Sequence, residues 1–248
     1  MRENIRLFVE LVSRIFPIKG TVIEVGSLRI PGQDDFADLR PFFSNHTYIG
    51  CDISPGPGVD RIESAERMSF SDNSVIAVLN IDTIEHIKNP LKAVKEAYRI
   101  LEDGGMLILS SVMNFPLHCF PSDYWRFTPE GLGVLLEDFP VRVVGAQGYE
   151  LNPHTVYGIG FKTGAKNVDK IVERVNEFFY KFSSGLKELQ RRISEQSSFK
   201  YRLIGEIIRL KITGRFIPRS ISRLYKNTLY FKVYRDSELL SSFKKEIL

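Results

Sequence analysis

The feature of the sequence that most constrains its fold is an alternation of short, β-branched apolar runs with longer segments of helical periodicity. Apolar residues recur at helical spacing over residues 2–16, and Pro17 ends that segment. Strands are expected at residues 21–25, 47–51, 75–80, 106–111, 141–146 and 155–161. Three further helices are expected at residues 35–43, 90–101 and 128–136. Strands that alternate with helices favour a doubly wound α/β fold, in which helices cover both faces of a mostly parallel sheet.

The composition is that of a folded chain. A hydrophobic content of 43% over 248 residues is sufficient for a packed core, which argues against disorder. The chain has two cysteines, and it shows neither a signal-peptide pattern nor a long apolar run. We therefore expect a reducing, cytoplasmic setting.

Charge divides the chain into two unequal parts. Residues 1–161 carry 14 basic and 21 acidic side chains, whereas residues 162–248 carry 20 basic and 9 acidic ones. Such an asymmetry between halves indicates that the two parts have different partners. We place the boundary near Gly164, between a domain of residues 1–164 and a basic, mainly helical C-terminal extension of residues 165–248.

Candidate ligand-binding residues follow the first two predicted strands, because ligands of open α/β sheets bind beyond the carboxyl ends of the strands. Glu24, Gly26 and Ser27 end the first strand, Gly32 follows, and Asp52 ends the second. An aspartate there can accept both hydroxyl hydrogen bonds of a ribose. The G-x-G-x-x-G turn of dinucleotide-binding proteins is absent, and the Glu24 carboxylate suits an ammonium group better than a pyrophosphate.

Five motifs continue this pattern along the chain. They are VIEVGS at residues 22–27, YIGCD at 48–52, SAERMSFSDNS at 64–74, IEHIKNP at 84–90 and EAYRILEDGG at 96–105. In this order and spacing, residues 21–161 resemble the class I S-adenosylmethionine-dependent methyltransferases. Two positions depart from the pattern of that family, since Leu28 stands in place of a glycine and Ser64 in place of an acidic residue.

The resemblance implies a Rossmann-like sheet of seven strands, the last of them antiparallel, and S-adenosylmethionine as cofactor. It places Gly26 against the methionine moiety, Asp52 at the ribose, Ala65 and Glu66 beside the adenine, and Asn80 near the transferred methyl group. The cofactor-binding residues expected on this basis are Glu24, Gly26, Ser27, Gly32, Asp52, Ile53, Ala65, Glu66 and Asn80. No set of metal ligands is expected.

The segment from residue 115 to 129 is the densest in chemically active side chains and resembles a subgroup associated with the synthesis of cell-surface polysaccharides. His118 is the candidate general base for a hydroxyl acceptor, and Asp123 would orient it or bind a sugar hydroxyl. The remaining candidates for acceptor binding are His86, Tyr124, Trp125 and Arg126. Structural roles are the alternatives: Trp125 and Phe127 in the core, Arg126 paired with a carboxylate, and Thr128 as a helix cap.

The C-terminal extension is expected to form amphipathic helices over residues 168–194 and 199–212, followed by interleaved basic and aromatic residues. That composition suits an anionic membrane surface, with nucleic acid as the competing partner and packing on the core or a second subunit as the third alternative. The sequence therefore predicts an O-methyltransferase for a saccharide or a lipid-linked small acceptor, cytoplasmic or peripheral at the inner face of the membrane. The alternatives are a non-catalytic scaffold and a nucleic-acid methyltransferase.

Overall fold

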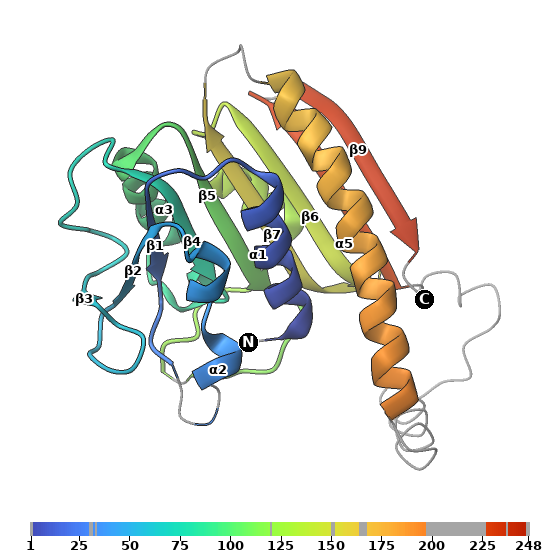
Figure 1. Ribbon diagram of the computed structural model, residues 1–248, viewed down its shortest axis with the longest axis horizontal. Coiled ribbons are helices and arrows are strands. Elements are labelled where there is room, and N and C mark those ends of the chain that lie inside the picture. The colour runs from blue at the N-terminus through green and yellow to red at the C-terminus, as the bar shows by residue number, and fades with distance from the viewer. Residues whose placement is uncertain are drawn as a thin grey trace.

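The computed structural model describes residues 2–29, 32, 34–119, 121–149, 152–163, 168–196, 227–236 and 238–246 (Figure 1). The strands of this part of the chain form one sheet of nine, in the order β3-β2-β1-β4-β5-β7-β6-β8-β9. They are β1 (Thr21–Val25), β2 (Thr47–Asp52), β3 (Arg61–Ile62), β4 (Val75–Ile81), β5 (Leu101–Val112), β6 (Val141–Tyr149), β7 (Asn152–Lys162), β8 (Asn227–Arg235) and β9 (Glu238–Glu246).

The sheet is mixed, with a parallel half and an antiparallel half. Strand β1 pairs in parallel with β2 and β4, β2 with β3, and β4 with β5. Strands β7, β6, β8 and β9 then follow β5 in antiparallel pairs. The strand order reverses between β1 and β4, which is where open α/β sheets bind their ligands.

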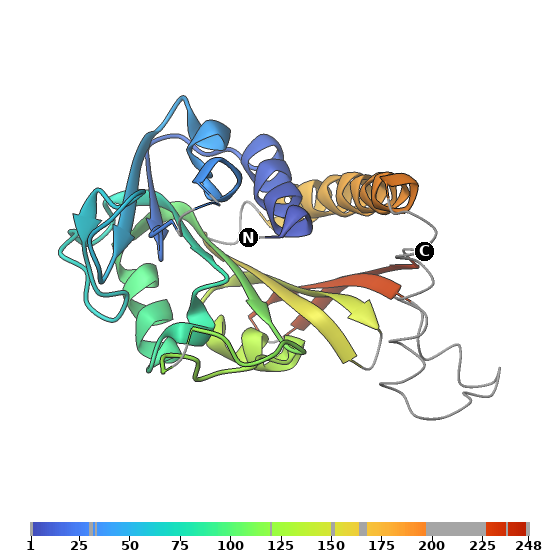
Figure 2. The same ribbon diagram turned by 90° about the horizontal axis from the view of Figure 1, so that it is seen from below.

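Helices cover both faces of the sheet, as Figure 2 shows. Helices α1 and α5 and the 3-10 helix η1 contribute side chains to the core on one face, and α3 and α4 contribute to the core on the other. The helices are α1 (Glu3–Ile15), α2 (Asp34–Ala37), α3 (Pro90–Ile100), α4 (Pro129–Leu135) and α5 (Val168–Gln196), and the 3-10 helices are η1 (Arg40–Phe43) and η2 (Ile84–His86). None of the described helices is both long enough and apolar enough to cross a membrane.

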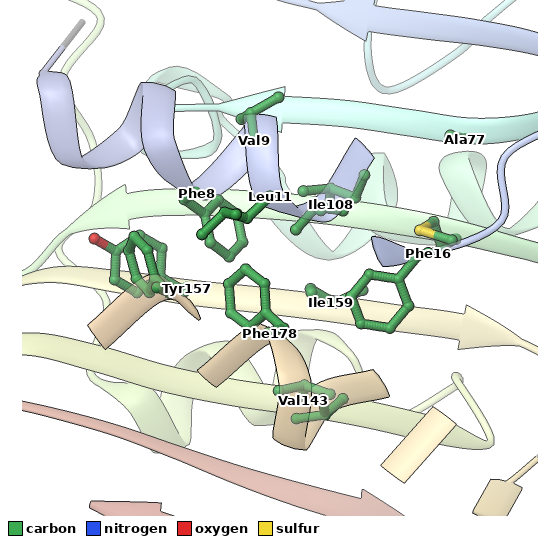
Figure 3. Close-up of a cluster of buried hydrophobic side chains, with 14 of the residues drawn as sticks. Phe8, Val9, Leu11, Phe16, Ala77, Ile108, Val143, Tyr157, Ile159 and Phe178 are labelled. Carbon is green, nitrogen blue, oxygen red and sulfur yellow. The ribbon is translucent and has the colours of Figure 1, made fainter. Parts of the chain in front are cut away.

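An aromatic cluster joins α1 and α5 to the sheet (Figure 3). The rings of Phe8 on α1 and Tyr157 on β7 lie 4.7 Å apart between centroids, and Phe8 lies 5.6 Å from Phe178 on α5. Phe182, one turn further along α5, packs 5.5 Å from Tyr157. These four side chains are fully buried, so α5 is part of the main core.

The doubly wound arrangement expected from the sequence is confirmed, but the expected single helix at residues 35–43 is wrong. The chain forms the short α2, breaks, and forms η1 instead. Pro41 explains the break, because a proline has no N–H with which to continue the hydrogen bonds of α2, whereas it is tolerated in the first turn of η1. Strand β5 begins earlier than the strand expected at residues 106–111, and its register with β4 shifts before Met106, near Gly104 with its φ of 86°.

The expectation of a seven-stranded sheet is also wrong, and the C-terminal extension contains strands that were not expected. The amphipathic helix at residues 168–194 is confirmed as α5, but β8 and β9 add two strands to the sheet beyond β6. In the middle of β8, Leu229, Phe231 and Val233 are fully buried at a spacing of two residues, which is the period of a strand. The helix expected at residues 199–212 lies outside the described residues.

Candidate functional site

The loop after β1 holds Gly26 in a conformation that only glycine adopts easily. Its φ is 82°, and a Cβ atom at this position would overlap the side chain of Thr83, which follows β4 in the sequence. The amide groups of Gly26 and Ser27 both donate to the carbonyl of Cys51, at 2.8 and 3.1 Å. The end of β1 is therefore held against the ends of both neighbouring strands.

Asp52, at the end of β2, is tied into the same loop. Its Oδ2 accepts from the amide of Leu28 at 3.3 Å, and its Oδ1 accepts from the amide of Ser54 at 3.0 Å. The side chain of Leu28 lies against Gly56, where a Cβ atom would overlap it. The loop thus accommodates the leucine that stands in place of a glycine. Ile53, beside Asp52, is 74% exposed.

Glu24 is a buried carboxyl group at the same end of β1. Its Oε2 accepts a hydrogen bond of 2.7 Å from the hydroxyl of Tyr48 on β2. Burial raises the pKa of Glu24 to about 7, and the hydrogen bond from Tyr48 opposes part of that increase. The expected partner of an ammonium group is therefore a carboxyl that takes up and releases its proton near neutral pH.

Two buried polar atoms near these strand ends have no hydrogen-bond partner in the described part of the chain. They are the Ser27 Oγ and the Asn80 Oδ1, at the ends of β1 and β4. Unsatisfied buried polar atoms are rare because each costs free energy, so their presence points to a ligand that satisfies them. Asn80 also lines a small cavity together with Ala65 and Val25. The residues present fit a polar cofactor that extends along these strand ends.

The loop after β3 is fastened to the start of α3. The Oε1 of Glu66 accepts from the amide of Asn89 at 3.1 Å, and its Oε2 lies 3.8 Å from the ammonium of Lys92. Asn89 in turn caps α3 by accepting from the amide of Lys92. Ala65 is buried, whereas Gly32 is exposed, with a φ of 85° and open space where a Cβ atom would stand.

The acceptor-side residues expected from the sequence lie in one loop between β5 and α4. Asp123 has a side chain only 4% exposed and receives four contacts: the His118 amide at 2.8 Å, the His118 Nδ1 at 3.3 Å, and both terminal nitrogens of Arg126 at 2.6 and 2.8 Å. The hydrogen bonds from Arg126 hold the pKa of Asp123 well below its usual range. Asp123 is thus an ionised group that positions both His118 and Arg126.

The same loop is bound to η2, which follows β4. The carbonyl of Glu85 accepts from the amides of Tyr124 and Trp125, and the indole of Trp125 donates to the carbonyl of Ile87 at 3.0 Å. The ring centroids of His86 and His118 lie 4.7 Å apart, edge to face. The structure therefore brings together the expected residues of η2 and of the loop.

The structural roles considered as alternatives for the loop residues hold for some of these residues and not for others. Trp125 is 42% exposed and so is not a core residue, whereas Phe127 is buried. Arg126 pairs with the carboxylate of Asp123, and Thr128 caps α4 by accepting from the amide of Gly131. Tyr124 is also exposed, so two consecutive aromatic side chains of the loop are open to solvent.

The sequence analysis assigned no site role to Asp82 or Glu85, two polar residues that follow the carboxyl end of β4. Asp82 has a φ of 47°, accepts from the Ser110 hydroxyl at 2.8 Å, and pairs with Arg2 at the start of α1. Glu85 is fully buried, accepts from the Ser111 hydroxyl at 2.8 Å, and has a pKa raised by burial to about 7. Their position after strand ends is the signal that could have identified them.

Comparison with known protein families gives a match, which covers part of this site. Residues 36–109 match a family model described as a methyltransferase domain. That segment contains Asp52, Ala65, Glu66, Asn80 and His86. No curated protein matches the chain.

One solved structure of similar shape agrees with the domain match at the level of the fold, and two others superpose less closely. A chain in the complex between the Haloferax volcanii Trm112 methyltransferase activator and a methyltransferase superposes with a TM-score of 0.50 and 15% identity, over 65% of this chain and 91% of that one. An S-adenosylmethionine-dependent methyltransferase of Thermotoga maritima gives a TM-score of 0.47 and 22% identity, over 64% and 91%. One of Aquifex aeolicus gives 0.44 and 20%, over 64% and 93%.

The domain match lies on the half of the sheet that carries the reversal of strand order, the expected ribose partner and the unsatisfied polar atoms. Its description as a methyltransferase domain agrees with the activity that the sequence motifs imply. The chain therefore carries a methyltransferase domain on a Rossmann-like α/β fold, and this match supports S-adenosylmethionine as the methyl donor.

Proposed function

We propose that the chain transfers the methyl group of S-adenosylmethionine to a hydroxyl group of a saccharide or a lipid-linked small acceptor. The observation that carries this proposal is the arrangement of His118, Asp123 and Arg126 beside His86, at the carboxyl ends of β4 and β5. A hydroxyl acceptor needs a general base, and a histidine held by an ionised carboxylate is suited to that task.

The hydrogen bonds of His118 define which nitrogen can accept a proton. Its Nδ1 lies 3.1 Å from the carbonyl of Pro116 and 3.3 Å from Asp123, and both of these groups only accept. The proton of a neutral ring is therefore on Nδ1, and the lone pair is on Nε2. In the proposed reaction the acceptor oxygen bonds to the methyl carbon, the carbon–sulfur bond breaks with its electron pair on sulfur, and Nε2 takes the hydroxyl proton.

The proposal of a saccharide acceptor is supported by the exposed aromatic residues Tyr124 and Trp125. Aromatic rings with one open face commonly stack against the apolar face of a sugar. Arg126 does not favour an anionic group on the acceptor, since its guanidinium is already engaged by Asp123 and by the carbonyls of Phe115 and Pro116. A neutral sugar hydroxyl is the acceptor that these contacts support best.

The proposal is tested with radiolabelled S-adenosylmethionine and a panel of free and lipid-phosphate-linked sugars. We expect label in at least one sugar, and we expect His118→Ala to slow that transfer about a hundredfold or more while binding of S-adenosylhomocysteine is retained. His46→Ala is the control, because His46 lies beside Phe43 and away from the loop. Absence of transfer to every sugar would overturn the acceptor class, and unchanged turnover in His118→Ala would remove His118 as the base.

The basic extension supports an additional proposal, that the enzyme binds an anionic membrane surface on which a lipid-linked acceptor would lie. Residues 197–226 carry eight basic and one acidic side chain. Positive segments of this kind gain about 1 kcal/mol per basic residue near an anionic surface. Co-sedimentation with anionic liposomes but not with neutral ones is expected, and equal recovery in the supernatant with both would refute it. Salt-sensitive binding to RNA in place of liposomes would favour a nucleic-acid partner.

A further inference from the structure

Three potential metal ligands converge at the acceptor loop. A ring nitrogen of His86, a ring nitrogen of His118 and the Sγ of Cys119 all lie within 4.8 Å of one another. His86 comes from η2 after β4, whereas His118 and Cys119 come from the loop after β5. The sequence analysis did not predict this cluster, because His86 lies 32 residues before His118 and the three residues share no motif spacing.

The hydrogen bonds of both histidines leave a lone pair for a metal ion. The Nδ1 of His86 lies 2.6 Å from the carbonyl of Ser122, and the Nδ1 of His118 lies 3.1 Å from the carbonyl of Pro116. A carbonyl only accepts, so each Nδ1 carries the hydrogen and each Nε2 is unprotonated. Metal-binding histidines characteristically donate their other N–H to a carbonyl or a carboxylate in this manner.

The ligands are supported by a second layer of contacts. Asp123 contacts both the amide and the Nδ1 of His118, and Arg126 holds the carboxylate of Asp123 from the other side. A carboxylate behind a metal-binding histidine orients the ring and makes its free nitrogen a better ligand. Cys119 has a φ of 51° and an exposed side chain, so its thiol is open to the solvent from which an ion would come.

We propose that His86, His118 and Cys119 bind a divalent transition-metal ion of the zinc class, with one coordination position left open. Nitrogen and sulfur ligands select zinc-like ions over magnesium or calcium, and three protein ligands with an open fourth position are typical of catalytic zinc. Donor atoms around a tetrahedral zinc ion lie about 3.5 Å apart. The ligand atoms of the cluster lie within 4.8 Å of one another, so they need to approach by about 1 Å to bind the ion.

The open position gives the ion a role in the reaction, and this role rests on the proposed function, whereas the binding of the ion does not. An acceptor hydroxyl bound there has its pKa lowered by the positive charge and gives up its proton to solvent. The oxygen then attacks the methyl carbon as proposed above. The Nε2 of His118 serves as base only in the metal-free protein, because the same lone pair binds the ion.

Cobalt(II) provides a spectroscopic test on the full chain after treatment with a chelator. We expect the visible bands of four-coordinate cobalt with a thiolate charge-transfer band, and displacement of both by zinc. Cys119→Ser should abolish the thiolate band, and His86→Ala should weaken cobalt binding about a hundredfold or more, since it removes a direct ligand. The matched controls are His46→Ala and Cys51→Ser, which replace the same residue types outside the cluster.

Two results would overturn the metal site: no such spectrum at stoichiometric cobalt, or a thiolate band that survives Cys119→Ser. Calorimetry of S-adenosylhomocysteine with the same samples shows whether each variant is folded and keeps the cofactor site. Retained binding of S-adenosylhomocysteine without binding of cobalt would therefore refute the metal site alone. Cobalt binding without transfer to any sugar would refute the proposed acceptor and leave the metal site standing.

Discussion

Glu24 and Gly26 lie two residues apart at the end of β1, and the structure gives each a different task. Gly26 allows the chain to turn against Thr83, whereas Glu24 places a buried carboxyl group beside the same turn. The sequence identified both from their position after a strand. It could not show that Tyr48 would be the partner of Glu24, because that contact depends on the register of β1 with β2.

The raised pKa of Glu24 makes stability depend on pH. Its pKa is about 7 in the folded chain and about 4.5 when unfolded, so the folded state retains a proton that the unfolded state loses between these values. This stabilising contribution is complete below pH 4.5 and is lost as the pH rises through 7. We expect wild type to lose about 3 kcal/mol more than Glu24→Gln between pH 4.5 and 8. Urea unfolding of both proteins across this range measures the difference, and parallel curves would contradict it.

Gly26→Ala separates steric overlap from backbone strain. Alanine at a φ of 82° costs about 1–2 kcal/mol, and overlap with Thr83 adds about 1–3 kcal/mol. Gly104→Ala is the matched control, since Gly104 has a φ of 86° and open space around its Cβ position. The free energy of unfolding should fall more in Gly26→Ala than in Gly104→Ala. Equal losses in the two variants would show that Thr83 does not restrict this position.

The sequence predicted which residues the acceptor loop contains, but it did not predict which of them contact one another or His86. The sequence placed His118, Asp123, Tyr124, Trp125 and Arg126 in one chemically dense segment, and the structure keeps them together. The pairing of His118 with His86 and the approach of Cys119 were beyond the sequence. These contacts join the ends of two different strands through a loop without regular secondary structure, whose path no local pattern specifies.

At the scale of elements, local periodicity predicted most of the helices and strands because apolar residues at a fixed spacing must face the same core. The expected elements were wrong where a proline or a run of basic residues accompanied the apolar pattern. Pro41 divides the helix expected at residues 35–43. The basic side chains of residues 227–235 indicated a surface that binds a partner. In the structure this segment is strand β8, in which the buried residues Leu229, Phe231 and Val233 alternate with less buried ones.

Helix α5 provides the element-scale prediction. Phe178 is fully buried against Phe8 and Phe231, whereas Tyr180, two residues later, is 68% exposed. Phe178→Ala should lower the free energy of unfolding by about 3–5 kcal/mol, because it removes a large buried side chain and leaves a cavity. Tyr180→Ala should change it by less than about 1 kcal/mol. Thermal or urea unfolding compares the two variants, and similar values would mean that α5 does not stabilise the core.

At the scale of the whole molecule, the chain combines a parallel half that carries the candidate cofactor site with an antiparallel half extended by β8 and β9. The two cores on opposite faces of the sheet hold these halves in one structure. The charges do not divide the chain into the same two halves as the sheet. The acidic part, residues 1–161, contains both candidate sites, and the basic part, residues 162–248, contains α5, β8 and β9. The proposed interaction with an anionic surface would therefore involve a different part of the molecule from the proposed chemistry.

The central claim is that S-adenosylmethionine binds at the ends of β1, β2 and β4. Isothermal titration calorimetry of the full chain with S-adenosylmethionine and with S-adenosylhomocysteine tests it directly, using wild type and Asp52→Ala. We expect one site per chain for both compounds, and a loss of affinity of about tenfold or more in Asp52→Ala, since a charge-assisted hydrogen bond is worth about 1.5–3 kcal/mol. No heat of binding with either compound, or an affinity unchanged by Asp52→Ala, would contradict the account.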